Sequence, residues 1–190
     1  KWAWQRLGVA QQKTGDLANS IVSMQRAVRC DQDDATSWQE LANSYYLQGK
    51  YACATKVLAR ILDMPGGKDN SSAAYLKGRL HLLLAEVDEA IEIFQALHAL
   101  RPNWVPAILG FGESLLRRAC EEYASGWLRQ STDTLVSSVK LLHNCVTIQP
   151  QLVAAWKMLG DALSRFAAAS PGDCQPVWSI LSASSVSDPG

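Results

Sequence analysis

The chain has 190 residues, and its 18 Lys and Arg against 18 Asp and Glu give a formal net charge of zero, so it lacks the overall basic excess with which nucleic-acid-binding proteins replace counterions around phosphate. Hydrophobic residues make up 48%, as in ordinary globular proteins, yet no apolar run reaches the roughly 18–20 residues needed to cross a bilayer. The cysteines are widely spaced and never form a Cys-x-x-Cys pair, which favours reduced thiols of an intracellular protein over a disulfide framework; they are Cys30, Cys53, Cys120, Cys145 and Cys174.

A regular period organises the first part of the chain. Trp4 and Trp38 are separated by thirty-four positions. The same interval separates two further pairs, Leu7 and Leu41, and Gly15 and Gly49. Trp-x-x-Leu followed by a turn glycine at this period is the signature of a tetratricopeptide repeat, a helix pair that buries its apolar face by stacking on its neighbours. We therefore predict repeat 1 over residues 1–34 and repeat 2 over residues 35–70.

The third repeat is predicted over residues 71–103. Gly78 stands at the position where paired helices approach closely, Ala85 stands at the turn where glycine is usual, and Ala74 replaces the tryptophan. The interval from Gly49 to Ala85 is thirty-six positions, which is the period plus a two-residue insertion.

The fourth repeat, predicted over residues 104–150, is abnormally long. Gly112 and the closing Pro150 are thirty-eight positions apart, whereas the matching interval of the third repeat, from Gly78 to Pro102, is twenty-four. We expect the fourteen extra residues to lengthen both helices by about two turns each, at 3.6 residues per turn. The chain should reverse near Gly126, and the expected cap of the second helix is Ser131 or Thr132.

A fifth unit begins with Trp156, Leu159 and Gly160, which repeat the motif of the first two repeats. We predict its first helix over residues 151–170, followed by a tail over residues 171–190 that holds a short helix and then frays. Because no clear second helix follows, we expect Trp156, Leu159 and Leu163 to be left uncovered.

The outward positions of the first helix of each pair are the predicted partner-binding groove. Aromatic side chains and Arg are common anchors of protein interfaces. The competing interpretation is an ordinary solvated face with ion pairs between repeats. The predicted groove residues are Trp2, Gln5, Gln39, Asn43, Tyr46, Tyr75, Arg79, Glu113, Arg117, Lys157, Asp161 and Arg165.

No pattern of catalytic or metal-binding residues is present in the sequence. The three histidines lack Cys, Asp or Glu at metal-ligand spacing, and the glycines form no phosphate-binding string. Arg117-Arg118 could contact phosphate, but Glu121-Glu122 lies one turn further on and favours ion pairs along the helix. We therefore predict a non-enzymatic protein with no catalytic residue, no metal and no cofactor.

Three stretches together resemble the tetratricopeptide scaffold subunit of the superkiller complex, the tetratricopeptide repeat protein 37 family. They are Ala3-Trp4-Gln5-Arg6-Leu7-Gly8, Trp104-Val105-Pro106-Ala107 leading to Gly112-Glu113, and Trp156-Lys157-Met158-Leu159-Gly160-Asp161-Ala162. The likeness extends from Lys1 to about Leu181. It implies an all-α tetratricopeptide-repeat α-solenoid, a right-handed superhelix of antiparallel helix pairs, and we expect the chain to be a piece of a longer protein.

The resemblance also implies the partners. The family scaffold assembles a DExH-type RNA helicase subunit with a WD-repeat subunit, and the complex feeds RNA to the exosome for 3′-to-5′ decay in the cytoplasm. We expect protein partners, only indirect contact with RNA, no membrane association, and a cytoplasmic location with a nuclear pool. Which partner binds this segment stays open, as does the choice between the groove, the convex face and the long fourth repeat.

Three alternatives compete with this interpretation. A chaperone adaptor that grips C-terminal carboxylates would need Lys and Asn along the groove, and only Asn43, shifted in position, fits that pattern. A repeat segment of a repeat-fused enzyme would need a catalytic module that the chain does not supply. Direct RNA contact would use Arg79, Arg117 and Arg165, against the neutral net charge.

Overall fold

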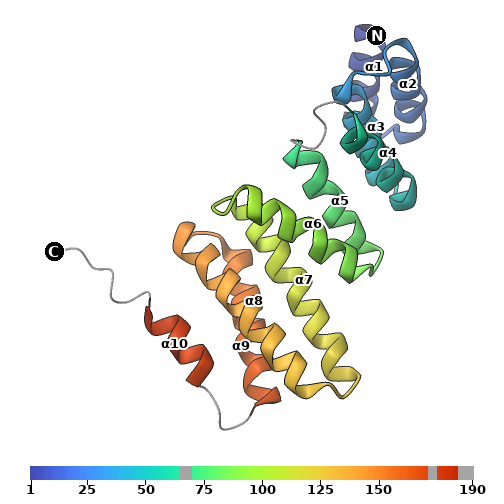
Figure 1. The fold of residues 1–190 in the computed structure, drawn as a ribbon. Helices are drawn as coiled ribbons and strands as arrows, with labels where there is room; N and C mark the ends of the chain where they lie inside the picture. Colours follow the sequence, from blue (N-terminus) through green and yellow to red (C-terminus); the bar gives the residue numbers. More distant parts are fainter. Residues whose placement is uncertain (65–69, 171–174, 184–190) are drawn as a thin grey trace, which may run out of the picture. The chain divides into compact units, whose positions relative to one another are not determined.

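The computed structural model describes residues 1–64, 70–170 and 175–183, and all regular structure in this part is helical (Figure 1). The chain divides into two compact units, Lys1–Glu86 (unit 1) and Val87–Gly190 (unit 2). Within the described residues, no helix is both long enough and apolar enough to cross a membrane.

Unit 1 consists of helices that contact one another in chain order. They are α1 (Trp2–Lys13), α2 (Leu17–Cys30), α3 (Ala35–Leu47), α4 (Tyr51–Asp63) and α5 (Ser71–Leu83). Each helix packs against the next, and α1 also contacts α3. The large side chains that are fully buried include Met24 of α2 and Leu58 and Ile61 of α4. The second helix of each pair therefore lies between the first helices and supplies much of the core.

Local sequence signals set the helix ends in unit 1. Asp16, Asp34 and Asn70 precede α2, α3 and α5, and each side chain accepts a hydrogen bond from a backbone N–H in the first turn. The turns at Gly15 and Gly49 have φ angles of 82° and 77°. Glycine adopts this left-handed conformation without the steric cost that a Cβ atom brings.

The indoles of the repeat motif close the loop that precedes their helix. Trp38 Nε1 donates to the carbonyl of Gln32 at 2.8 Å, and Trp156 Nε1 donates to the carbonyl of Pro150 at 2.7 Å. In both cases the acceptor lies six residues earlier in the chain. The same residue type at the same repeat position thus makes the same contact in both units.

Unit 2 continues the alternation of first and second helices. Its helices are α6 (Val87–Leu100), α7 (Val105–Ala124), α8 (Leu128–Ile148), α9 (Val153–Ala169) and α10 (Gln175–Ala183). α7 packs against α6 and α8, and α8 also contacts α9 and α10. Ile108, Val139 and Leu142 are fully buried between these helices, and Val177 of α10 joins the same core.

The hairpin of α7 and α8 is longer than the others. These helices have 20 and 21 residues, compared with 12 and 14 for α1 and α2. In the short hairpin, the Ser20 hydroxyl donates to the carbonyl of Gly8 at 2.9 Å. This contact joins residues that are twelve apart and fixes the alignment of the two helices.

The long hairpin contains this serine contact twice. The Ser138 hydroxyl donates to the carbonyl of Gly112 at 2.9 Å, and the Ser131 hydroxyl donates to the carbonyl of Ala119 at 2.8 Å. The two acceptors are seven positions apart in the chain, and so are the two serines. The long hairpin is therefore a short hairpin with one seven-residue segment, about two turns, added to each helix.

Two expectations about unit 2 are wrong. Ser131 and Thr132 do not cap α8, because the helix already begins at Leu128, directly after the turn at Gly126 with its φ of 83°. Leu159 and Leu163 are not left uncovered, because Leu159 packs into the core that α8 and α9 share and is only 4% exposed, and Leu163 packs against the same core. Trp156, by contrast, is 52% exposed, as expected.

Candidate functional site

In unit 1, two predicted groove residues join neighbouring first helices to one another. The Gln5 amide donates to Asp34 and Thr36 at 3.1 Å each, and the Gln39 amide donates to Ser72 at 3.3 Å. Their hydrogen-bonding capacity is thus used within the stack. In this part of the groove, the structure favours the interpretation that these side chains link neighbouring repeats over the interpretation that they bind a ligand.

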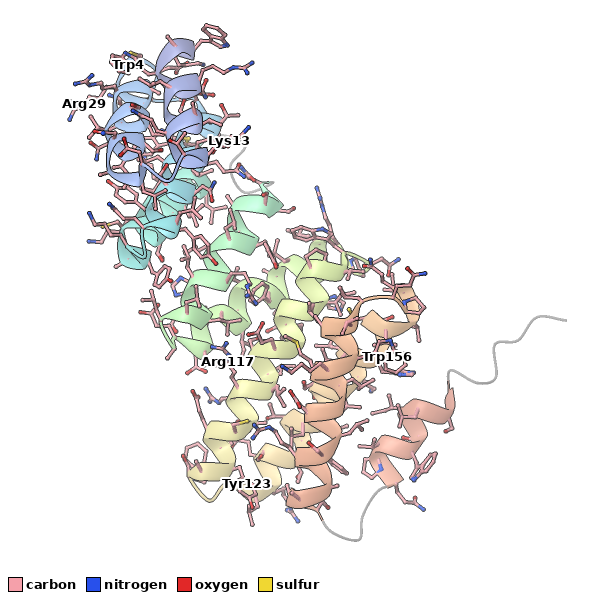
Figure 2. The ribbon with its side chains drawn as sticks, turned by 180° about the vertical axis from the view of Figure 1, so that it is seen from behind. Trp4, Lys13, Arg29, Arg117, Tyr123 and Trp156 are labelled. Carbon is pink, nitrogen blue, oxygen red and sulfur yellow. The ribbon has the colours of Figure 1, made fainter. Side chains whose placement is uncertain are left out.

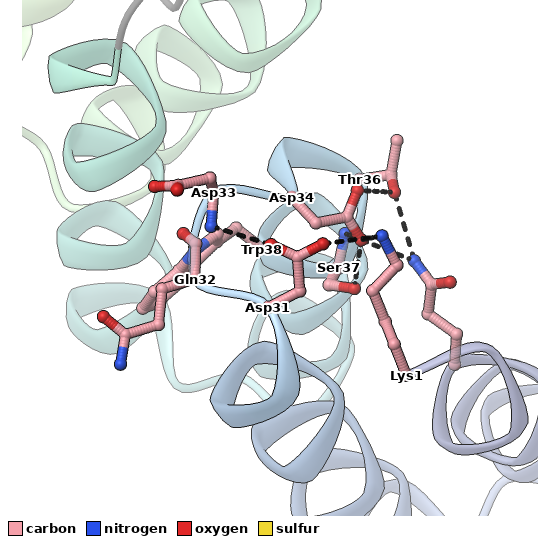
Figure 3. A network of polar contacts seen from close by, with 9 residues as sticks. Lys1, Asp31, Gln32, Asp33, Asp34, Thr36, Ser37 and Trp38 are labelled. Carbon is pink, nitrogen blue, oxygen red and sulfur yellow. Dashed lines mark hydrogen bonds and ion pairs between the residues drawn. The ribbon is translucent and has the colours of Figure 1, made fainter.

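Figure 3 shows the polar network around the start of α3. Lys1 Nζ lies 2.9 Å from Asp31 Oδ2 and 3.5 Å from Asp34 Oδ2. Burial opposes ionisation of Asp34, but hydrogen bonds from Ser37 and Thr36 and the charge of Lys1 outweigh it and lower the pKa of this carboxyl. The network stabilises the helix start rather than forming an open anion or cation site.

The remaining groove residues of unit 1 surround little free space. Asn43 and Tyr46 of α3 line a pocket of only about 10 Å³. Leu58 of α4 and Leu76 and Leu80 of α5 complete its lining. Tyr75 and Arg79 are half-buried on α5, and both residues already take part in an interaction. Trp2 is 67% exposed, and the Arg6 guanidinium lies 5.6 Å from the centre of one of its rings.

In unit 2, the arginines of α7 form ion pairs. Arg117 lies 2.8 Å from Glu113, and Arg118 Nε lies 3.2 Å from Glu122. Arg118 also pairs with Asp88 of α6, and Glu122 accepts a hydrogen bond from Thr134 of α8 at 2.8 Å. The prediction that ion pairs along the helix engage these arginines agrees with the geometry of α7.

The predicted groove residues of α9 are all open to solvent. Lys157, Asp161 and Arg165 are all exposed. Figure 2 shows Arg117 midway along α7, Tyr123 near the turn that ends it, and Trp156 near the other end of the bundle on α9. Arg165 lies on the last turns of α9, and there it borders a partly open pocket whose lining is mostly apolar.

This pocket, which we call the α7–α9 pocket, has a volume of about 160 Å³. It lies above α8 between the C-terminal turns of α7 and α9. Its lining residues are Ala119, Cys120, Tyr123, Ser131, Leu135, Arg165 and Ala168. Tyr123 is 51% exposed and Arg165 is exposed, so the pocket can be reached from solvent.

Of these residues, only Arg165 belongs to the groove predicted from the sequence. Four of the other lining residues correspond to residues of the small unit 1 pocket. Each lies seventy-seven positions after its counterpart in the sequence. These four are Ala119, Cys120, Tyr123 and Leu135, and their counterparts are Ala42, Asn43, Tyr46 and Leu58. Recognising this step requires knowing that each helix of the long hairpin gained seven residues.

No other described group suggests chemistry. Within residues 1–64, 70–170 and 175–183, no three His, Cys, Asp or Glu side chains are placed to hold a metal ion. Cys145 is buried, and burial raises the pKa of its thiol, which makes it unreactive. His81 Nδ1 pairs with Glu86 at 2.7 Å. Cys174 lies outside the described residues.

Comparisons with known proteins agree with the repeat pattern. The family model described as "Tetratricopeptide repeat" matches residues 3–34. The chain is 26% identical to "Tetratricopeptide repeat protein 37" of Xenopus laevis over 162 residues, which are 85% of this chain and 10% of that protein. It is 24% identical to human "Superkiller complex protein 3" over 90% of this chain and 11% of that protein, and 26% identical to "Superkiller protein 3" of Schizosaccharomyces pombe over 87% of this chain and 12% of that protein.

Solved structures show the same fold. MamA residues 41 to end from Desulfovibrio magneticus RS-1 superimposes with a TM-score of 0.71 at 14% identity, covering 98% of this chain and 96% of that one. YrrB superimposes with a TM-score of 0.53 at 17% identity, covering 96% and 91%. At these identities the likeness concerns the fold alone.

The tetratricopeptide-repeat α-solenoid and the resemblance to the superkiller scaffold proteins are confirmed. The similarity to those proteins covers most of this chain, whereas the chain spans only about a tenth of their length. Their activity and partners therefore enter below only as proposals.

Proposed function

We propose that this chain is a protein-binding segment of a superkiller-type scaffold, a non-catalytic repeat array that holds an RNA helicase subunit and a WD-repeat subunit together for exosome-mediated 3′-to-5′ RNA decay in the cytoplasm. The observation that carries the proposal is the similarity to superkiller proteins from vertebrates and yeasts over 85–95% of this chain. A scaffold of stacked helix pairs offers extended surfaces for partners instead of a catalytic cleft.

The described side chains support a binding role. The ionic cluster around Arg118 and Glu122 is satisfied within α6, α7 and α8, whereas the charges of a catalytic group would have to face a cleft. YrrB, which shares the fold, is described as a repeat protein with an unusual peptide-binding site. We extend peptide binding to the present chain as part of the proposal.

Co-purification tests this function. The full chain, immobilised through a terminal tag, is mixed with the purified DExH-type helicase and WD-repeat subunits of the same complex, separately and together. The proposal predicts that at least one subunit is retained at physiological salt. Release of both by a chain whose circular dichroism shows folded helices would contradict it.

Direct RNA binding is the alternative function that must be distinguished from the scaffold function. Single-stranded RNA added without protein partners should give no saturable binding, because the net charge is zero and α7 Arg117 and Arg118 are already paired with carboxylates. Tight binding that weakens steeply with salt would move the function from scaffold to RNA contact.

A further inference from the structure

The α7–α9 pocket lies between helices at a site that leucine side chains fill in unit 1. In unit 1, the equivalent site between α3 and α5 has a volume of about 10 Å³, because Leu76 and Leu80 of α5 occupy it. In unit 2, the wall that α9 contributes consists of Arg165 and Ala168. The walls from α7 and α8 are kept, and α9 has no counterpart of the two leucines that would close the third side, so about 160 Å³ stays open.

Counting along the repeats places Arg165 at the position of Leu76. Leu76 stands two positions before Gly78 of α5, and Arg165 stands five positions after Gly160 of α9. The difference is seven residues, which is the segment that the long hairpin adds to each helix. At the place where unit 1 supplies its own apolar side chain, unit 2 presents a charged one.

The Arg165 guanidinium adds a charge to the rim of an apolar pocket. Among the described residues, Arg165 has no ion pair or hydrogen bond through its side chain. Asp161, one turn earlier on α9, is exposed and forms no ion pair with it in this part of the chain. A guanidinium in this position can pair with a carboxylate of an incoming segment.

We propose that the α7–α9 pocket binds the phenylalanine side chain of an extended segment of a partner protein, and that Arg165 pairs with an acidic residue next to that phenylalanine. The inference rests on the proposed scaffold function and names the chemistry of one contact. A cavity of about 150 Å³ lined by apolar side chains accepts a benzene ring, so the pocket volume suits one phenyl group. The Tyr123 ring and the Cys120 sulfur on its wall make favourable contacts with an aromatic ring.

The test uses methyl NMR of the full chain. The Leu135 methyl signals, from the floor of the pocket, are followed while the peptide acetyl-Gly-Phe-Asp-Gly-amide is added. Saturable shifts of Leu135 are expected. Replacing the peptide phenylalanine by alanine should weaken binding by at least about tenfold, the loss of one buried ring. Replacing its aspartate by asparagine should weaken binding by about two- to fivefold, as for an exposed ion pair.

Three variants locate the binding site. Ala168→Leu places a larger apolar side chain on the pocket wall and should abolish the shifts, while leaving the melting temperature unchanged or higher. Ala167→Leu, on the exposed neighbouring position outside the pocket, is the matched control and should bind as the unchanged chain does. Arg165→Gln should remove the difference between the aspartate and asparagine peptides.

Three results would overturn the inference. They are absence of saturable Leu135 shifts with the phenylalanine peptide, equal binding by Ala168→Leu, and shifts of Leu135 by oligouridylate but not by the peptide, which would assign the pocket to RNA. Co-purification of the helicase or WD-repeat subunit tests the proposed scaffold function and is interpreted separately from the peptide experiment. Retention of a subunit without peptide binding rejects this contact only, and peptide binding without retention of either subunit rejects the superkiller assignment only.

Discussion

Individual charges in this chain differ greatly in their surroundings, and the two adjacent arginines of α7 show the contrast. Arg117 pairs with Glu113 on the helix surface, where its side chain is 43% exposed. Arg118 pairs with Glu122, whose side chain is only 3% exposed, and links it to Asp88. A buried carboxylate that loses its partner retains the cost of its desolvation, whereas a surface pair contributes little.

We therefore predict that Arg118→Ala lowers the free energy of unfolding by about 3 kcal/mol, near the lower end for a broken buried pair because Thr134 still donates to Glu122. Arg117→Ala, the matched control, should lower it by about 0.5 kcal/mol or less. Urea unfolding followed by circular dichroism measures both. Equal effects of the two substitutions would show that Glu122 is not held in a buried environment.

The second prediction at this scale concerns pH. The pKa of Asp34 is lowered from its usual value of 3.8, so its ionised form stabilises the folded chain above that pH, and the contribution is lost as the pH falls through the folded-state pKa. Asp34→Ala should cost about 1 kcal/mol at pH 7, the typical loss of an N-cap.

The gap between the unchanged chain and Asp34→Ala should narrow as the pH drops below about 3.8. Urea unfolding at a series of pH values measures it, with Asp33→Ala as a control that removes a neighbouring carboxylate but no cap of α3. A gap that stays constant down to the lowest accessible pH would mean that the charge of Asp34 does not contribute.

At the scale of turns, the repeat spacing predicted where each hairpin reverses, but not the conformational free energy that each turn costs. Gly15, Gly49 and Gly126 have φ angles between 77° and 83°, and Ala85 takes the same kind of conformation at 60°. A left-handed conformation costs a residue with a Cβ atom about 1–2 kcal/mol. Because the repeat geometry imposes the turn, Ala85 adopts it despite the strain.

Ala85→Gly should thus raise the free energy of unfolding by about 0.5–1 kcal/mol, since relief of strain exceeds the added chain entropy of glycine. Gly49→Ala should lower it by about 1 kcal/mol, although no atom lies within 4 Å of the added Cβ. Thermal unfolding of the two variants measures these changes in stability. A lower melting temperature for Ala85→Gly would contradict the strain at this turn.

The long hairpin makes a prediction at the scale of two paired helices. Removing residues 113–119 and 132–138 together brings Ser131 to a spacing of twelve residues from Gly112, the spacing that Ser20 has from Gly8 in the short hairpin. With Glu122→Leu added, because the deletion removes its partner Arg118, this shortened chain should fold cooperatively.

Removing either seven-residue segment alone places the two helices two turns out of step. We expect each single deletion to lose the cooperative thermal transition, as measured by circular dichroism, and the double deletion to keep it. A double deletion that unfolds like the single ones would show that the two segments are not equivalent insertions.

The limits of prediction from sequence follow from these elements. The interval of the repeat motif predicted the helix pairs and turns, because hydrophobic periodicity and glycine turns are local signals. The expected cap at Ser131 was wrong because a serine can donate to the partner helix as well as cap its own, and only the register of the hairpin decides between these uses. The groove residues were chosen by repeat position, which cannot show that Gln5 and Gln39 are already engaged by the next first helix.

At the scale of the whole chain, two units of stacked helix pairs include an open, mostly apolar pocket bordered by the exposed Arg165, and the similar proteins include human "Superkiller complex protein 3". Stacked repeats bury their apolar faces against their neighbours, so open apolar volume within the stack needs a reason. The scaffold proposal supplies it, because the surface that a repeat array leaves unfilled is available to a partner.

Hydrogen exchange of the chain, alone and with the helicase and WD-repeat subunits bound, tests this account most directly. The account predicts slower amide exchange on binding in peptides that cover residues 119–135 and 161–169, which border the α7–α9 pocket, and little change in peptides covering α1 and α2. Binding that leaves the exchange of both pocket segments unchanged would contradict it.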